Sequence, residues 1–474
     1  MTGDLLAVGV RLAYLVAAGL FIVGLKRMSS PRTARAGNRL SAVGMLIAVV
    51  AALLSERILS PVEVAAGLAL GSAIGLWLAR TTEMTSMPEL VAAFNGVGGA
   101  ASALVAIAEV FRVASEPDAP YGALTAFTVG LSVLIGAVTL TGSFVAYGKL
   151  RGTLTRAGFP GLRFVSVGLA GALLATLWLF VQTAAVLGPE HLVLLGVVAA
   201  LSCVIGVLLV LPIGGADMPV VVALLNAYSG LAAAATGFVL ANEALVVSGA
   251  LVGASGVVLT QIMCRAMNRS LSNVLLGGFG AAASTGPAAT GGDALPVRAT
   301  TPDDAAILMA YAGRVVIVPG YGLAVAQAQH EVREMAGLLE AEGVDVSYAI
   351  HPVAGRMPGH MNVLLAEANV PYDVLVEMDD INADFPQVDV VLVVGANDVV
   401  NPGARTDPQS PIYGMPVLNV DQARNVIVLK RSMAAGYAGI ENPLFHAPNT
   451  QMLFGDAKAS IKGIVAELKA LQAA

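Results

Sequence analysis

Nine long apolar runs occupy the first 270 residues of this chain. They cover roughly residues 4–26, 40–55, 61–79, 88–110, 122–147, 163–187, 191–212, 218–239 and 243–264. A bilayer core is crossed by about 20 apolar residues in helical form. Only 12% of all residues are charged, whereas soluble domains carry about 25%. The runs predict an α-helical membrane domain of about nine transmembrane helices and exclude an ordinary soluble protein.

Lysine and arginine are unevenly distributed between the loops that join these runs. Twelve lie in the loops of one side, and only Arg57 and Arg112 lie in the loops of the other. Because short cytoplasmic loops carry an excess of basic residues, the N-terminus is expected outside and the C-terminal half in the cytoplasm. The sequence thus predicts a multi-pass protein of the cell (inner) membrane, with the lipid bilayer as its surroundings.

The rest of the chain has a different composition. Residues 271–474 carry 11 basic and 21 acidic side chains, whereas residues 1–270 carry 15 and 11. Such an acidic region argues against nucleic-acid binding. Residues 271–303 are rich in Gly, Ala, Ser and Thr, which predicts a linker between the membrane domain, 1–270, and a soluble domain, 304–474.

Strand and helix patterns alternate beyond the linker. Apolar runs at 315–318, 344–350, 388–394 and 426–429 predict strands, and 323–342, 360–368 and 457–472 predict helices. Residues 374–380 are ambiguous. Alternation of this kind is typical of a doubly wound parallel sheet, so we expect an α/β, Rossmann-like domain.

A glycine-containing turn joins the first of these strands to its helix. The segment Gly320–Val325 reads GYGLAV, which matches a dinucleotide-binding fingerprint except for valine at the third small position. The first glycine permits the turn, and the second lets a pyrophosphate approach the backbone at the helix N-terminus. The same spacing occurs at Gly96 and Gly278 without a preceding strand, so a plain structural turn remains the alternative.

The ends of two predicted strands bear on the choice of nucleotide. The second strand ends in Ile350–Pro352 without the acid that usually holds the ribose 2′-hydroxyl of NAD. The strand at 426–429 is followed by Lys430, Arg431 and Ser432, two cations and a hydroxyl that suit a 2′-phosphate. Together they favour NADP(H), and a solvated basic pair is the alternative.

Three further loops follow predicted strands. They are 354–360, which contains Arg356, 395–398, and 436–439. Ligands of open α/β sheets bind outside the carboxyl ends of the strands. These loops are therefore candidate ligand contacts, although each alone is compatible with an ordinary turn.

Two asparagines interrupt the apolar runs. Asn95 and Asn226 lie eight and nine residues from the ends of their runs, which places both roughly 12–14 Å deep at 1.5 Å per residue. Hydrogen bonding between helices and a place in an ion pathway both account for such amides. No histidine is expected inside a span, the five being His191, His330, His351, His360 and His446.

Several longer segments match a known family. They are 318–329, 351–378, 395–401, 429–445 and 452–460, with 216–230 and 263–270 in the membrane half. In these segments, and over nearly its whole length, the chain resembles the beta subunit of proton-translocating NAD(P) transhydrogenase. The resemblance implies a proton-conducting membrane domain and an NADP(H)-binding domain. It also implies an alpha subunit that binds NAD(H), contributes further membrane helices and pairs with this chain in a dimer of alpha–beta assemblies.

The resemblance also implies roles for single residues. Hydride would pass directly between the two nicotinamides, with Asp398 nearby and coupling protonation to nucleotide binding. The expected cofactor-binding residues are Gly320, Tyr321, Gly322, Val325, Arg356, Gly395, Asn397, Asp398, Lys430, Arg431, Ser432 and Tyr437. The expected proton pathway contains Asn95, Asn226 and Asp217, and no metal is expected.

One position departs from the family. Asn95 stands where many relatives have a membrane histidine, in the segment MPELVAAFN (87–95). An amide carries no proton at physiological pH, so we hypothesise that a partner membrane chain supplies a histidine that faces Asn95 and Asn226. A transporter or channel gated by a nucleotide-binding domain is the alternative function, and it leaves the long matching segments unexplained.

Overall fold

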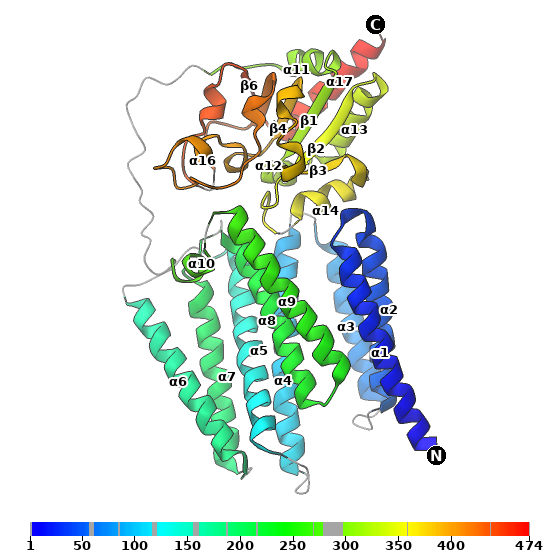
Figure 1. Ribbon diagram of the computed structural model, residues 1–474, viewed down its shortest axis with the longest axis vertical. Coiled ribbons are helices and arrows are strands. Elements are labelled where there is room, and N and C mark those ends of the chain that lie inside the picture. The colour runs from blue at the N-terminus through cyan, green and yellow to red at the C-terminus, as the bar shows by residue number, and fades with distance from the viewer. Residues whose placement is uncertain are drawn as a thin grey trace. The chain divides into compact units, whose positions relative to one another are not determined.

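The computed structural model describes residues 2–55, 61–83, 86–115, 121–154, 161–185, 188–214, 217–268, 270–277, 297–357, 359–436 and 438–473. The chain divides into two compact units, each shown in Figure 1. The first comprises Met1–Gly215 and Val221–Thr260, and the second comprises Ala216–Val220 and Gln261–Ala474.

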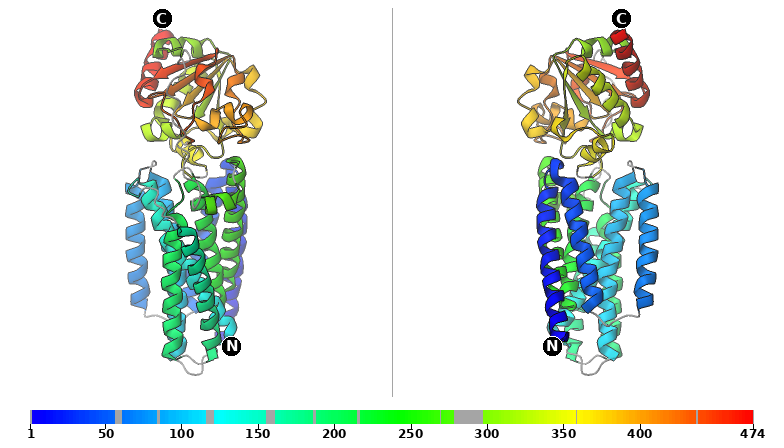
Figure 2. Two further views of the ribbon diagram at one scale, coloured as in Figure 1. Left: turned by 90° about the vertical axis from the view of Figure 1, so that its left-hand side faces the viewer. Right: turned by 90° about the vertical axis from the view of Figure 1, so that its right-hand side faces the viewer.

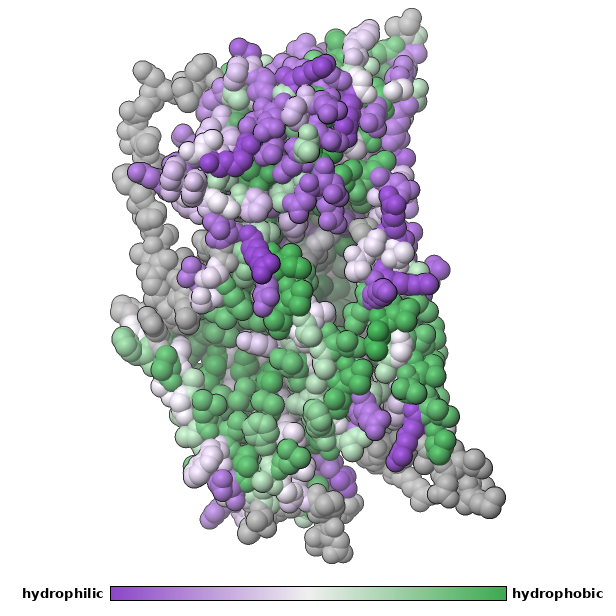
Figure 3. Space-filling model, viewed as in Figure 1, coloured by the Kyte–Doolittle hydropathy of each residue, from purple (hydrophilic) through white to green (hydrophobic). Residues whose placement is uncertain are grey.

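The first unit is helical. Among the described residues, nine helices are long and apolar enough to cross a membrane. They are α1 (Thr2–Met28), α2 (Pro31–Ser55), α3 (Pro61–Thr81), α4 (Met87–Ser115), α5 (Ala123–Leu150), α6 (Leu162–Gln182), α7 (Pro189–Val210), α8 (Met218–Val239) and α9 (Glu243–Ala266). Their exposed surface is largely apolar (Figure 3), which confirms the predicted membrane helices.

Two details of these helices differ from the prediction. Helix α2 begins at Pro31, so Arg32 and Arg35, expected in a loop, lie in its first turns. Proline suits a first helical position, where its missing N–H would have no partner. His191, expected outside the spans, is a buried residue of the first turn of α7.

Glycine allows α4 and α5 to pack closely. A Cβ atom on Gly99 would lie 2.7 Å from the carbonyl oxygen of Gly136, and one on Gly136 would lie 2.5 Å from that of Gly99. Real Cβ atoms do not approach other atoms this closely. The two helix backbones therefore meet at a point where small residues are required, as in other membrane helix pairs.

The second unit contains a six-stranded parallel sheet, which confirms the Rossmann-like prediction. The strand order is β3-β2-β1-β4-β5-β6. The strands are β1 (Arg314–Pro319), β2 (Asp345–Ile350), β3 (Leu375–Glu377), β4 (Val390–Val394), β5 (Asn425–Lys430) and β6 (Thr450–Phe454). The helices around it are α11 (Pro302–Ala310), α12 (Tyr321–Ala326), α13 (Gln329–Ala341), α14 (His360–Glu367), α15 (Met378–Ile381), α16 (Gly403–Thr406) and α17 (Ala457–Ala473).

Every residue of β4 is buried. Because successive side chains of a strand point to opposite faces, apolar residues pack against both faces of the sheet. On one face, Val391 and Val426 pack against Phe385 and Leu444 from the connecting segments. Helix α17 packs against α11 and α13 and runs beside the sheet (Figure 2). Burial on both faces explains why β4 reads as a continuous apolar run.

Several elements differ from the sequence-based prediction. The single helix expected at 323–342 is two helices, α12 and α13, because Gln327 adopts a left-handed conformation with φ of 49°. Strand β6 was not predicted, and the ambiguous segment 374–380 forms β3 followed by α15. In the predicted linker, Leu271–Gly277 forms α10 and Thr301 caps α11, while 278–296 lie outside the described residues.

Candidate functional site

The site is built where the order of the strands reverses. Strand β1 is flanked by β2 on one side and β4 on the other, and the loops after β1 and β4 leave the sheet side by side. In open α/β sheets a crevice forms at this reversal, outside the carboxyl ends of the strands. The predicted fingerprint at Gly320–Val325 lies at this point of the sheet.

Glycines let these two loops touch through their backbones. The Gly320 N–H donates to the carbonyl of Val394 at 2.9 Å, and the Gly322 N–H donates to the carbonyl of Gly395 at 2.9 Å. A Cβ atom on Gly320 would fall closer than 3.0 Å to the backbone of Gly395 and Ala396, and one on Gly322 would lie 2.7 Å from Gly395 Cα. Gly395 itself has a φ of 68°, which favours glycine. The floor of the crevice is therefore bare backbone.

Two cations border this crevice. Lys430 ends β5, and its ammonium donates to the carbonyl of Ala434 at 2.6 Å. Burial lowers the pKa of Lys430, and the carboxylate of Asp398 opposes this effect. Arg431 is exposed and pairs with the carboxylate of Asp456 at 3.3 Å. The hydroxyl of Ser432 accepts the N–H of Ala434 at 3.4 Å.

The loops after β4 and β5 are joined at Asp398. Its Oδ2 accepts the N–H of Ala438 at 3.0 Å. Gly436 lies so close that a Cβ there would be 2.5 Å from Oδ1 of Asp398. The side chain of Asn442 donates to the carbonyl of Asn397 at 3.1 Å. A movement of the loop after β5 would therefore break or shift the contacts of Asn397 and Asp398.

The loop after β2 brings Arg356 to the fingerprint helix. The Arg356 guanidinium lies over the ring of Tyr321, 4.3 Å from its centre. The Arg356 N–H donates to Nδ1 of His360 at 3.0 Å. His360 is 1% exposed, and burial, with the charge of Arg356, lowers its pKa to about 4. The imidazole is therefore neutral and holds the backbone at Arg356 in place.

A second histidine fixes the start of the same loop. Nδ1 of His351 accepts the N–H of Val353 at 3.2 Å, so Nε2 carries the proton and donates to the carbonyl of Pro416 at 2.9 Å. Burial lowers the pKa of His351 to about 4, while the Pro416 contact and the charge of Asp379 oppose this shift.

Most of the predicted cofactor residues are brought together. One cavity is lined by Gly322, Val325, Gly395, Asn397, Lys430 and Arg431. Gly320 lies against the backbone of Gly395, which lines the cavity, Asp398 lies close to Gly436, and Tyr321 and Arg356 contact each other. Ser432 lies exposed in the loop after β5. Tyr437 lies outside the described residues.

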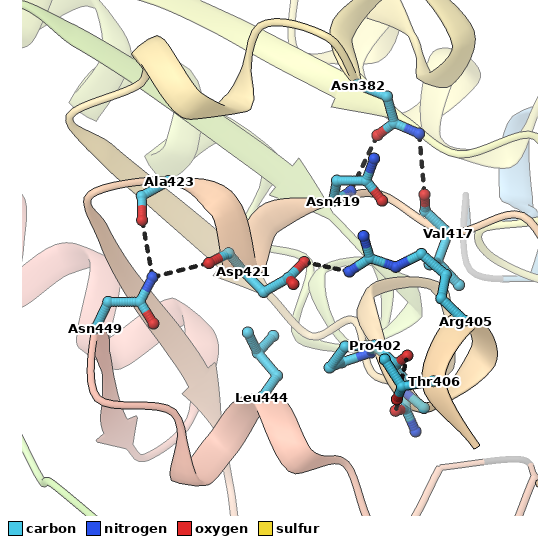
Figure 4. Close-up of polar contacts among 12 residues, drawn as sticks. Asn382, Pro402, Arg405, Thr406, Val417, Asn419, Asp421, Ala423, Leu444 and Asn449 are labelled. Carbon is cyan, nitrogen blue, oxygen red and sulfur yellow. Dashed lines mark hydrogen bonds and ion pairs between the residues drawn. The ribbon is translucent and has the colours of Figure 1, made fainter.

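Side-chain amides fasten the segment that follows Asp398 (Figure 4). Asn382 donates to the carbonyl of Val417 and accepts the N–H of Asn419, each at 3.0 Å. Asn449 donates to the carbonyls of Asp421 and Ala423 at 3.0 and 2.8 Å. Arg405 of α16 pairs with Asp421 at 2.6 Å. These contacts anchor the long connection from β4 to β5, which carries no regular strand of its own.

The predicted proton-pathway residues lie near α8. The amide of Asn95 reaches the carbonyl of Val222 at 3.4 Å, one helical turn before Asn226, and the hydroxyl of Ser229 donates to the carbonyl of Asn95 at 3.1 Å. Asn226 is half-buried in α8. Asp217 precedes α8 and is 9% exposed.

Sequence reasoning missed several residues of these sites. Asp456 and Asn442 contact predicted residues, and His360 positions Arg356. Asp456, Asn442 and His360 all lie inside segments that resemble the family, so that similarity was an available signal. Ser229, whose hydroxyl contacts Asn95, also lies inside such a segment, 216–230, but a serine in a membrane helix gives no signal of its own because serine and threonine are common there.

Comparison with known proteins identifies the family of this chain. A family model described as NAD(P) transhydrogenase beta subunit matches residues 10–467. A protein of Rhodospirillum rubrum named NAD(P) transhydrogenase subunit beta is 50% identical over 462 residues, which cover 96% of this chain and 97% of the relative. A second relative, from a named strain of the same species, matches with the same identity and coverage. The resemblance recognised from the sequence is confirmed, and the chain belongs to the NAD(P) transhydrogenase beta subunit family.

Proposed function

We propose that this chain binds NADP(H) in the crevice between the loops after β1 and β4. With an alpha subunit that binds NAD(H), it would couple hydride transfer between the two nucleotides to proton translocation. The observation that supports the proposal most strongly is the backbone contact of Gly320, Gly322 and Gly395 next to the two cations Lys430 and Arg431. In this assignment residues 1–270 are the membrane domain, 271–303 the linker, and 304–474 a cytoplasmic NADP(H)-binding domain.

The residues of the crevice fit such a nucleotide. Glycines at 320, 322 and 395 let the loops after β1 and β4 meet through their backbones, and a glycine-containing turn of this kind is what lets a pyrophosphate approach the backbone in dinucleotide sites. Lys430 and Arg431 supply the cations that a 2′-phosphate requires, and Ser432 supplies a hydroxyl. No acidic residue ends β2, where NAD sites carry one.

The roles of the residues follow from their chemistry. The bound nucleotide supplies the carbon that gives or takes the hydride, so no side chain of this chain is needed as an acid or base for that step. Arg356 would contact the pyrophosphate from its position over Tyr321. Asp398 interacts with the charge of Lys430 and accepts a hydrogen bond from Ala438. The surroundings of its carboxylate would therefore change when the loop after β5 opens or closes.

Proton movement is proposed to bias nucleotide binding. A membrane potential of 100 mV is worth about 2.3 kcal/mol per proton, which is similar to the 1–3 kcal/mol typical of coupling between sites. Asn95, Asn226 and Asp217 are the proposed pathway residues of this chain, with a histidine contributed by the partner. Replacing every membrane histidine of the partner without loss of pumping would exclude that contribution.

The proposal is tested by titration calorimetry of the purified full-length chain with NADPH and NADH. We expect NADPH to bind more tightly, since each charge-assisted hydrogen bond contributes about 1.5–3 kcal/mol. Lys430→Ala and Arg431→Ala should each weaken NADPH binding about tenfold or more and leave NADH binding unchanged. Lys469→Ala is the control, because this exposed lysine pairs with Glu334 on helices away from the crevice.

Two results would contradict the proposal. Equal affinity for both nucleotides in the unaltered chain would remove the assignment of NADP(H). Nucleotide binding that changes ion flux without hydride transfer in the complete alpha–beta assembly would favour the gated transporter instead.

A further inference from the structure

Two buried asparagines lie between the loop after β4 and the loop after β5. Asn401 is 0% exposed and Asn442 is 1% exposed. Asn401 directly follows the 3₁₀ turn Asp398–Val400, and Asn442 directly precedes the 3₁₀ turn Pro443–His446. Buried amides are normally paired with hydrogen-bonding partners, so the partners of these two show which segments they join.

Each amide uses its oxygen locally and its nitrogen across the two loops. Oδ1 accepts the backbone N–H two residues further along the chain, at 2.9 Å for Asn401 and 3.0 Å for Asn442. Nδ2 of Asn401 donates to the carbonyl of Glu441 at 3.2 Å, and Nδ2 of Asn442 donates to the carbonyl of Asn397 at 3.1 Å. The orientation of both amides is therefore fixed, because a reversed amide would turn a donor toward an N–H and an acceptor toward a carbonyl.

The two bonds between the loops hold one short turn at both of its ends. Asn397 precedes the turn Asp398–Val400 and is bonded to Asn442. Asn401 follows the turn and is bonded to Glu441. Because residues 441 and 442 are adjacent, both ends of the turn are fixed to one point of the chain. The turn can move away from the loop after β5 only if both bonds break.

Asp398 lies on this turn and contacts the loop after β5 a second time. Its Oδ2 accepts the N–H of Ala438 at 3.0 Å, three residues before Glu441. A Cβ atom on Gly436 would lie 2.5 Å from Oδ1 of Asp398. Hydrogen bonds weaken steeply when donor and acceptor are misaligned. The contact between Asp398 and Ala438 therefore depends on the position of the turn, which the two asparagines fix.

This contact is one of two that hold the loop after β5 beside the cavity. The other is the bond from the Lys430 ammonium to the carbonyl of Ala434 at 2.6 Å. Lys430, Ala434 and Gly436 line the cavity. A nucleotide that leaves the cavity past this loop would have to separate these contacts. Only the contact of Asp398 comes from the turn that the asparagines hold.

We propose that Asn401 and Asn442 are positioning residues that control the release of NADP(H). They hold the turn Asp398–Val400 so that the carboxylate of Asp398 stays directed at the N–H of Ala438. Loss of either amide donor loosens the loop after β5 and lets the nucleotide leave sooner. The inference rests on the proposed binding of NADP(H). Among the described residues that line the cavity neither asparagine is found, so both act through Asp398.

The test measures the release of NADPH from the purified full-length chain. Stopped-flow fluorescence follows bound NADPH while an excess of NADP+ displaces it. Asn442→Ser keeps an oxygen for the N–H of Leu444, since serine and asparagine are equally good in such capping positions, but its side chain is too short to reach Asn397. Release should become about tenfold faster, with the association rate within twofold. Asn401→Ser should give the same change and decides the question if Asn442→Ser does not fold.

Asn449→Ser is the matched control for a general loss of stability. Asn449 also joins two segments through its amide, which donates to the carbonyls of Asp421 and Ala423 at 3.0 and 2.8 Å. It precedes β6, at the edge of the sheet opposite the cavity. This variant should melt at a lower temperature, as Asn442→Ser does, and release NADPH within twofold of the unaltered chain. An equal increase of the release rate in the control would overturn the inference.

Asp398→Ala shows whether the asparagines act through the carboxylate. In this background Asn442→Ser should change the release rate less than twofold, because the contact with Ala438 is already lost. Full additivity of the two changes would overturn the inference, and so would release within twofold of the unaltered chain in both serine variants. If the unaltered chain binds no NADPH, the proposed function fails instead, so the two failures are distinguishable.

Discussion

Replacing Gly320 by alanine tests whether the two loops of the crevice must meet through their backbones. The added Cβ atom would lie closer than 3.0 Å to backbone atoms of Gly395 and Ala396, which cannot rotate away as a side chain does. Overpacking costs about 1–3 kcal/mol, and we expect the upper part of this range. For a unit of this size, about 3 kcal/mol lowers Tm by roughly 6–12 °C.

The matched control is Gly337→Ala in helix α13. There the nearest atom to the added Cβ is Nη1 of Arg333 at 3.8 Å, an ordinary contact. Alanine inside a helix is favoured over glycine by about 0.5–1 kcal/mol, so this variant should be as stable as the unaltered chain or more stable. The two changes add the same methyl group to the same unit.

Differential scanning calorimetry of the purified chain in detergent measures both variants, and the transition that shifts with NADPH identifies the second unit. Gly320→Ala should also lose NADPH binding, because the loops that line the cavity must separate. If Gly320→Ala melts within 2 °C of the unaltered chain (about 0.5–1 kcal/mol) and binds NADPH equally well, close backbone contact is not required and the reasoning is wrong.

Three further predictions concern the second unit. His351 and His360 have pKa values of about 4, below their ordinary value. The unfolded chain therefore binds protons first, and the free energy of unfolding should fall as pH drops from 6.5 toward 4, by up to about 1.4 kcal/mol per pH unit for each group. Calorimetry at stepped pH should show a weaker dependence on pH in His351→Gln. Asp456→Asn, which keeps an acceptor at the start of α17 but frees Arg431, should raise NADPH affinity severalfold in a titration, and a decrease would contradict this. Asp389 binds the N–H groups of residues 313 and 314 at the opposite edge of the sheet; Asp389→Ala should cost about 1–3 kcal/mol in unfolding without altering NADPH affinity.

The sequence predicts elements whose pattern is local. Strand β4 is a continuous apolar run, and the fingerprint lies directly between a strand and a helix, so both were recognised. Strand β6 was missed because it contains Thr450 and Gln451 and pairs with β5 only in the folded sheet. The break at Gln327 was missed because both halves of 323–342 have helical character and only the backbone at that residue departs from it.

The site shows the same division. The glycines and cations that surround the crevice could be predicted from the sequence, because they follow directly after apolar runs that predict strands. Contacts between distant segments were not, because a hydrogen bond such as that from Ala438 to Asp398 involves a backbone N–H that every residue possesses. The position of His191 was mistaken because its surroundings come from three separate segments, at Tyr121, Phe180 and Thr183.

The mutual contact of Gly320, Gly322 and Gly395 has a consequence for how this site evolves. A larger residue at any one of them collides with the backbone at another, and a second substitution changes only side chains, so it leaves those backbone atoms in place. Substitutions at these three glycines are therefore expected to be selected against. Selection for another nucleotide is left with the rim, where Lys430 and Arg431 can change one at a time while the fold persists.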